Sequence, residues 1–244
     1  MSTVEAIPAA TVIVMRDVAG GPPELLMVER SRAMAFAGGA LVFPGGRIDP
    51  GDHLLTDSHP DAAARVAAIR ETIEEAGISI GMACDAESLG ALRAQLHAGT
   101  PFAQLLAEAG LALDLDALMP FARWLPYGLP HRVFDTRFYL ARAPEGAAPQ
   151  VDGSENVRLC WITAQGALDL ADRGEAMVIY PTRRNLERLA LFDGFDSAMA
   201  HTRRFPIEPI TPFVESRAGV DWLCIPEGLG YPVTTERMDR AVRA

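Results

Sequence analysis

Short apolar runs and turn residues alternate through the first fifty positions, a pattern typical of β-strands. Residues 9–15 are apolar and rich in β-branched side chains, so they predict a buried strand. A glycine–proline turn at 20–23 follows, and residues 25–30 predict the second strand of a hairpin. Residues 41–43 predict another short strand, which ends in a proline–glycine–glycine turn.

A helical period dominates the next part of the chain. Residues 61–76 place apolar positions at helical spacing and stop at Gly77, a residue that suits the end of a helix. Residues 85–120 then predict a helical insert. Its short helices are expected at 86–97, 101–109 and 115–119.

Strand-like runs return in the second half, and they are mixed with helices. Strands are expected at 121–125, 133–142 and 156–162. Thr163 and Thr182 suit the N-cap positions of helices at 164–172 and 183–192. Residues 196–244 form a C-terminal extension with extended runs near 207–214 and 222–225. We expect the run at 222–225 to pair with a sheet edge or with another subunit.

The order of these elements lacks the regular alternation of a parallel α/β fold, so it favours an α+β sandwich. We expect residues 1–244 to form a single domain that includes the insert and the extension. With 49% hydrophobic and 22% charged residues, the composition is that of a globular protein.

The charge of the chain limits the ligands it can take. Its formal net charge is −10, which argues against nucleic acid or an anionic membrane as the main partner. All 22 basic residues are arginines, so an anionic ligand must be held by arginine or by a metal ion. The sequence shows neither a signal peptide nor an apolar run long enough to cross a bilayer, and we expect a cytoplasmic protein. The three cysteines are too far apart for a zinc pair and are expected to be reduced.

Three acids share one face of the helix expected at 61–76. At about 100° per residue, Glu71 lies about 40° from Glu75 and about 60° from Glu74. Such a group of like charges weakens an isolated helix. A hard cation such as Mg²⁺ or Mn²⁺ offsets their repulsion, because it prefers oxygen ligands. Arg70 is expected to hold one of these carboxylates by a forked ion pair.

The alternative interpretation is a solvated acidic helix face, which is the commoner meaning of such a cluster. The segment upstream favours a site instead. Residues 43–47 form a strand end followed by two glycines, and glycine lets backbone approach a phosphate or a neighbouring helix closely.

These residues resemble the signature of the Nudix hydrolases. Gly46 and Asp52 occupy the first part of that signature, and residues 70–78 occupy the second part in register. There are three departures. Asp52 stands in place of a glutamate, Thr72 in place of an aliphatic residue, and ten additional residues lengthen the loop before the helix. Because loop insertions cost little, the helix itself is expected to persist.

The resemblance implies a Nudix α/β/α sandwich with a mixed sheet and a metal-dependent attack of water on a phosphoanhydride. It assigns Glu71, Glu74 and Glu75 as ligands of Mg²⁺ or Mn²⁺, and Arg70 as the residue that orients Glu71 or Glu74. Glu74 and Arg70 are therefore also candidate catalytic residues. Members of the family often recruit another carboxylate from a distant loop, and Glu155 is the candidate here as ligand or general base.

A second resemblance concerns the substrate. Coenzyme A diphosphatases of the family carry a motif that Arg30, Ser31, Gly39, Leu41 and residues 43–46 match. Its inner arginine position is occupied here by Ala35, and Arg32 or Arg47 is expected to replace that contact. The candidate substrate-binding residues are Arg30, Arg32, Arg47, Gly45 and Gly46.

The first functional hypothesis is thus hydrolysis of the diphosphate of coenzyme A or acyl-coenzyme A. The alternatives are an ADP-ribose or dinucleoside polyphosphate hydrolase, and a Nudix-like domain that senses a nucleotide without cleaving it. Apolar residues of the insert either pack it onto the domain, as we expect, or form a lid over an acyl group. A homodimer is expected from the frequency of such assemblies.

Overall fold

The computed structural model describes residues 5–31, 37–55, 59–126, 133–151 and 156–241. Its main strands are β1 (Ile7–Arg16), β2 (Glu24–Arg30), β3 (Leu41–Val42), β4 (Gly45–Arg47), β5 (Met119–Trp124), β6 (Phe134–Arg142), β7 (Asn156–Thr163) and β8 (Pro209–Ile210). They form a mixed sheet of order β3-β2-β1-β6-β5-β8, in which β4 also pairs with β1 and β7 with β2. The β1–β6 and β5–β8 pairs are parallel, and the others are antiparallel.

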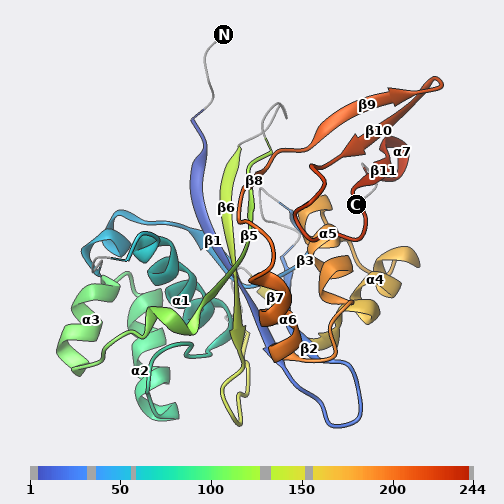
Figure 1. The fold of residues 1–244 in the computed structure, drawn as a ribbon. Helices are drawn as coiled ribbons and strands as arrows, with labels where there is room; N and C mark the ends of the chain where they lie inside the picture. Colours follow the sequence, from blue (N-terminus) through green and yellow to red (C-terminus); the bar gives the residue numbers. More distant parts are fainter. Residues whose placement is uncertain (1–4, 32–36, 56–58, 127–132, 152–155, 242–244) are drawn as a thin grey trace.

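Helices cover both faces of this sheet (Figure 1). One face carries α1 (Ala62–Ala76), α2 (Ala86–His97) and α3 (Phe102–Ala109), preceded by the 3₁₀ helix η1 (Pro50–Leu55) and followed by η2 (Leu115–Ala117). The other face carries α4 (Ala164–Asp172), α5 (Tyr180–Leu189) and α6 (Phe195–Thr202). The expected α/β/α sandwich with a mixed sheet is therefore confirmed.

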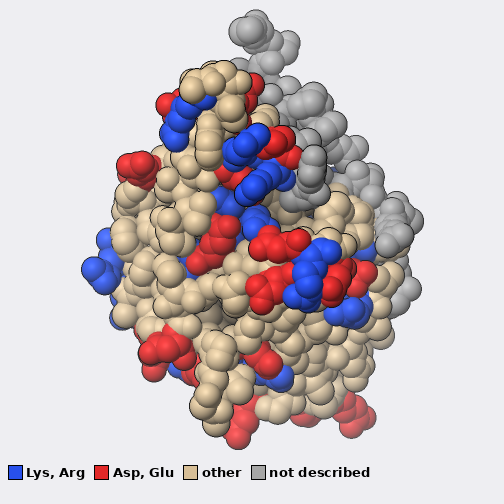
Figure 2. Space-filling view, turned by 90° about the vertical axis from the view of Figure 1, so that its right-hand side faces the viewer, with Lys and Arg blue, Asp and Glu red and all other residues tan. Residues whose placement is uncertain are grey.

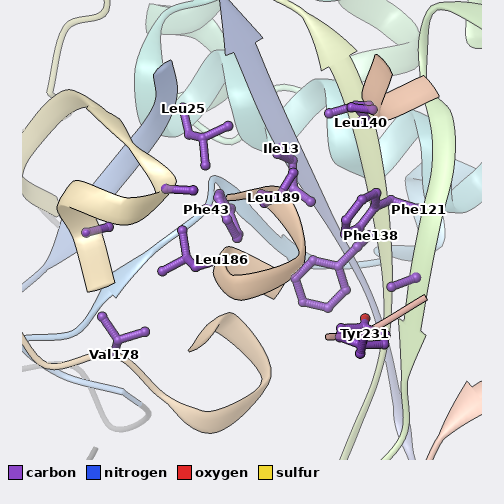
Figure 3. Packing of buried hydrophobic residues seen from close by; sticks show 14 of the residues in the cluster. Ile13, Leu25, Phe43, Phe121, Phe138, Leu140, Val178, Leu186, Leu189 and Tyr231 are labelled. Carbon is purple, nitrogen blue, oxygen red and sulfur yellow. The ribbon is translucent and has the colours of Figure 1, made fainter. Parts of the chain in front are cut away.

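Strand β1 divides the interior into two cores because its side chains alternate between the faces. Val12 and Val14 pack with α1, α2 and α3, whereas Ile13 and Met15 pack with α4, α5 and α6. Figure 3 shows this second core, in which Ile13 lies among side chains from the sheet and from α5. Arg70 and the three candidate glutamates Glu71, Glu74 and Glu75 lie on α1 and thus belong to the first layer.

The extension after α6 forms a small antiparallel sheet of its own. Its strands are β9 (Phe213–Arg217), β10 (Val220–Cys224) and β11 (Thr235–Arg237), and α7 (Met238–Ala241) follows them. Residues 222–224, which were expected to pair with a sheet edge or with another subunit, belong to β10 and pair with β9 and β11 of this small sheet. Residues 209–210 join the edge of the main sheet instead.

The face that carries the extension, α4 and α5 mixes both signs of charge (Figure 2). Ion pairs on this side include Arg183–Asp172 at 2.6 Å and Arg184–Glu236 at 2.9 Å. Opposite charges are therefore interspersed on this face and do not form a patch of one sign.

Some expected element ends were wrong. Thr163 caps α4 by accepting a hydrogen bond from the Gly166 N–H. Thr182, however, lies inside α5, which begins at Tyr180 because Pro181 suits the first turn of a helix. The expected helix at 115–119 is only the 3₁₀ turn η2 at 115–117, because β5 begins at Met119. Helix α6 has no counterpart among the expected helices.

The apolar residues of the insert pack it onto the domain, as expected, and do not supply a lid. Those buried against α1 and the sheet are Leu92, Leu96, Phe102, Leu105 and Leu106. The cysteines are free thiols. Within the described residues, no helix combines the length and apolar character needed to cross a bilayer.

Candidate active site

Helix α1 brings the three glutamates to β4. Its apolar positions Val66, Ile69 and Ile73 are fully buried in the first core. The helix ends at Gly77, whose left-handed backbone (φ 64°) lets its N–H donate to the Ile73 carbonyl. Thr72, which departs from the aliphatic residue of the signature, is buried but satisfied, because its hydroxyl donates to the Ala68 carbonyl of the same helix.

Arg70 lies at the centre of a network of carboxylates. Its Nη1 donates to Glu71 Oε1 at 2.9 Å and to Glu74 Oε2 at 3.1 Å. Its Nη2 donates to the Arg47 carbonyl at 3.0 Å. The expected role of Arg70 in orienting Glu71 or Glu74 matches this geometry, which engages both carboxylates at once.

Asp52 completes this network. Both its oxygens accept from Arg70, one from Nε and one from Nη2, each at 3.0 Å. The Asp52 side chain is almost fully buried, and the Asp49 N–H donates to it as well. The shorter aspartate thus reaches the arginine although the loop before α1 is longer than in the family pattern. The ten additional residues leave the network intact.

The glycines of β4 allow the strand to touch the helix. The Gly45 N–H donates to Glu75 Oε2 at 2.9 Å. Gly46 lies so close to the Glu71 carboxylate that an added Cβ would overlap it, and a Cβ on Gly45 would overlap the backbone of β1. At Gly45 a side chain would meet backbone, whereas at Gly46 it would displace the Glu71 carboxylate, so glycine at both positions preserves this close approach.

The electrostatics of the site follow from this burial. Burial is the main cause that raises the pKa of Glu71 to about 8, against the lowering effect of Arg70 and with smaller raising effects from Glu75 and Glu74. Burial is also the largest cause of the raised pKa of Glu74. Burial alone would lower the pKa of Arg70, but hydrogen bonding to Asp52 and the surrounding negative charges raise it.

The donor set suits a hard divalent cation. No three His, Cys, Asp or Glu side chains in the described ranges already stand as a complete metal-binding group. Glu71 and Glu74 nevertheless converge, since both lie about 3 Å from the same Arg70 nitrogen. Each uses one oxygen on Arg70, and within the described chain its second oxygen accepts no hydrogen bond. Carboxylate oxygens in this arrangement fit Mg²⁺ or Mn²⁺.

The expected substrate-binding residues are only partly placed. Gly45, Gly46 and Arg47 form β4 beside the glutamates, and Arg30 ends β2. The Nε atom of Arg30 is buried, and no hydrogen-bond acceptor reaches it within the described residues. The other candidates, Arg32 and Glu155, lie outside the described residues.

Sequence reasoning missed two residues that contact the carboxyl end of α1. Arg93 and His97 of α2 both reach the Glu74 carbonyl. Their spacing of four residues on one helix face was the only local signal, and it did not indicate what that face contacts.

Comparisons with known proteins agree with the motif and the fold. A solved Nudix hydrolase from Alicyclobacillus acidocaldarius superposes with a TM-score of 0.71 and 29% identity, covering 82% of this chain and 97% of that one. The chain is 29% identical to a "putative nudix hydrolase 7" of Caenorhabditis elegans and 24% identical to the acyl-coenzyme A diphosphatase NUDT19 of Xenopus laevis. These two matches cover 70% and 69% of this chain, but only 57% and 60% of the relatives. No protein-family model matches.

The signature residues converge in one network, and the fold is shared across nearly all of a solved relative of 29% identity. In signature, fold and sequence, the chain is similar to the Nudix hydrolases.

Proposed function

We propose that this protein is a hydrolase that depends on a divalent cation and cleaves the phosphoanhydride bond of a nucleoside diphosphate derivative. The observation that carries the proposal is the Arg70 network. One buried guanidinium holds Glu71 and Glu74 together on α1, while Gly46 of β4 touches Glu71. A solvated acidic face would not place a buried arginine and a glycine strand against its carboxylates.

The residues divide the chemical work between them. Bound at Glu71, Glu74 and Glu75, the cation would supply neutralisation of phosphate charge and orientation of water. Arg70 fixes the carboxylates, and the Gly45 N–H fixes Glu75. In the reaction, the oxygen of water bonds to phosphorus and the bridging P–O bond breaks. A base, for which Glu155 is our candidate, takes the proton of the water.

For the substrate we propose coenzyme A or an acyl-coenzyme A. The match of Arg30 and residues 39–46 to the motif of coenzyme A diphosphatases supports this choice. Arg30 is the last residue of β2, and its buried Nε has no hydrogen-bond acceptor within the described chain. A guanidinium in this state is suited to bind an anionic ligand. The relative from Xenopus laevis is named as an acyl-coenzyme A diphosphatase.

A substrate panel tests both levels of the proposal. The purified protein is incubated with coenzyme A, acetyl-coenzyme A, ADP-ribose, NADH and diadenosine polyphosphates, with Mg²⁺, Mn²⁺ or chelator. We expect cation-dependent release of 3′,5′-ADP from coenzyme A. Turnover of ADP-ribose without 3′,5′-ADP from coenzyme A would overturn the substrate assignment alone. Failure to cleave any member of the panel would overturn the proposed hydrolase.

A further inference from the structure

Each of the last four backbone carbonyls of α1 accepts a hydrogen bond. The last four carbonyls of a helix have no partner within the helix. In α1 these belong to residues 73–76. The Ile73 carbonyl accepts from the Gly77 N–H and the Ala76 carbonyl from the Gln150 N–H, each at 2.9 Å. The remaining two carbonyls belong to Glu74 and Glu75, which carry the carboxylates of the site.

Side chains of α2 satisfy these two carbonyls. Arg93 donates to the Glu74 carbonyl through Nε at 3.0 Å and through Nη2 at 2.9 Å. The same Nη2 also lies 3.4 Å from the Glu75 carbonyl. His97 Nε2 lies 3.0 Å from the Glu74 carbonyl oxygen and donates to it when it carries the ring proton. A cation at the carboxyl end of a helix is also favoured by the helix dipole.

The insert holds Arg93 firmly in this place. Leu92 and Leu96 of α2 are buried in the first core together with residues of α1. Arg93 and His97 each follow one of these leucines, so they lie on the adjoining side of α2, about 100° around the helix. Gly77 leaves room for the guanidinium, because an added Cβ there would lie 3.1 Å from Arg93 Nη1. The position of Arg93 is thus fixed by packing on one side and by a glycine on the other.

Arg93 also reaches a third segment. Its Nη2 donates to the Gln150 carbonyl at 2.8 Å, and the Gln150 N–H in turn donates to α1. Gln150 lies in the connection between β6 and β7, which leads to residues 152–155 and the candidate base Glu155. A single guanidinium therefore joins the last turn of α1 to the connection that precedes residue 152 in the sequence.

We infer that Arg93, supported by His97, is a positioning residue through which the helical insert fixes Glu74 and Glu75 for cation binding. The inference deepens the proposed function and rests on it. Two arginines bind Glu74: Arg70 donates to its side-chain carboxylate, and Arg93 donates to its backbone carbonyl. Without Arg93 the last turn loses its donors, and the ends of helices are the first parts to open.

The test compares two arginines that join α1 to the insert. Arg93→Gln removes the contacts at the Glu74 turn. Arg65→Gln is the matched control, because Arg65 of α1 donates to the carbonyls of Leu115 and Leu118, far from the glutamates along the helix. Arg93→Lys keeps the charge and part of the hydrogen bonding. Each variant is measured for thermal unfolding, for Mn²⁺ affinity of the free protein by electron paramagnetic resonance, and for hydrogen exchange of residues 71–77.

Arg93→Gln is expected to weaken Mn²⁺ binding about 10-fold or more, as loss of a residue that supports metal ligands does. Exchange at residues 71–77 is expected to quicken by a similar factor, with Arg93→Lys intermediate. Arg65→Gln should lower the unfolding temperature and leave Mn²⁺ affinity within twofold. If either glutamine variant fails to fold, Arg93→Lys and Arg65→Lys are compared instead.

Two results separate the inference from the proposed function. Mn²⁺ affinity and exchange at residues 71–77 that stay at wild-type values in Arg93→Gln would overturn the inference, while the hydrolase proposal would stand. A wild-type protein that binds no Mn²⁺ would overturn the proposed function. Faster exchange in Arg93→Gln would then show that Arg93 still fixes this turn, and unchanged exchange would overturn the inference too.

Discussion

Single residues set the geometry of the site through contacts that other side chains would disturb. Asp52 replaces a glutamate and still meets Arg70 with both oxygens, because η1 brings it into the protein interior. Thr72 replaces an aliphatic residue, and its hydroxyl donates to the Ala68 carbonyl of the same helix. Both departures from the signature are therefore compatible with the network. Gly46 is the position at which a small change should matter most.

Gly46→Ala is expected to reduce turnover about 100-fold, because a misplaced group at an active site commonly costs that much. The added methyl group would overlap the Glu71 carboxylate, which is the mobile end of a flexible side chain. Glu71 can move aside, so the unfolding temperature should change little. Gly51→Ala is the control, since an added Cβ there meets nothing within 4 Å. Equal turnover for wild type and Gly46→Ala would refute the importance of this contact.

At the scale of elements, α1 concentrates negative charge that the fold has partly desolvated. The cost of that burial appears in the raised pKa of Glu71, about 8 in the folded protein against 4.5 for an ordinary glutamate. Between those values the folded state binds more protons than the unfolded chain. The free energy of unfolding contributed by Glu71 must therefore fall as pH rises through this window.

In the presence of chelator, we expect the free energy of unfolding to decline with a slope that approaches about 1 kcal/mol per pH unit from Glu71 alone. Urea unfolding between pH 5 and pH 8 measures it. Glu71→Gln removes the titrating group, so the variant should lose this part of the slope and become the more stable protein at pH 8. Identical slopes for the two proteins would contradict the raised pKa.

The elements that could be predicted from the sequence are those whose signals are local. Helix α1 has its apolar period and its terminal Gly77 within one segment, and the resemblance to the signature led us to expect Arg70 beside Glu71 or Glu74. Its contact with Asp52 was not among these expectations. The start of α5 was misplaced because Thr182 suggested a cap where Pro181 had already begun the helix. The contacts of Arg93 join residues up to 57 positions apart, and no local pattern reports such a pairing.

On the scale of the whole molecule, the site and the C-terminal extension belong to opposite helical layers. The extension is tied to the second layer through Tyr231, whose hydroxyl accepts from Trp124 Nε1 at 3.1 Å and donates to Asn185 Oδ1 at 2.7 Å. These groups are buried, and Trp124 and Tyr231 belong to the second core, whereas α1 packs in the first. Loss of the Tyr231 hydrogen bonds should therefore lower the free energy of unfolding without changing turnover.

Tyr231→Phe is expected to lower the free energy of unfolding by about 1–3 kcal/mol, because it leaves two buried polar groups without their partner. Turnover per folded molecule should remain that of wild type. Tyr180→Phe serves for comparison: the Tyr180 hydroxyl donates a hydrogen bond to the Leu223 carbonyl at 3.2 Å, and the loss of this one bond should cost less. A fall in turnover of folded Tyr231→Phe would show that the two layers are coupled.

The central claim is that the glutamates of α1 perform cation-dependent hydrolysis, and Glu75→Gln tests it most directly. Glu75 is buried and accepts from the Gly45 N–H, so the amide fits the same space without the charge. Coenzyme A cleavage is measured against Mg²⁺ concentration and with chelator, with Glu108→Gln, an exposed position on α3, as control. We predict that Glu75→Gln keeps its circular dichroism spectrum but loses nearly all turnover, and that chelator silences the wild type. Undiminished turnover in Glu75→Gln, or full wild-type activity with chelator, would contradict the account.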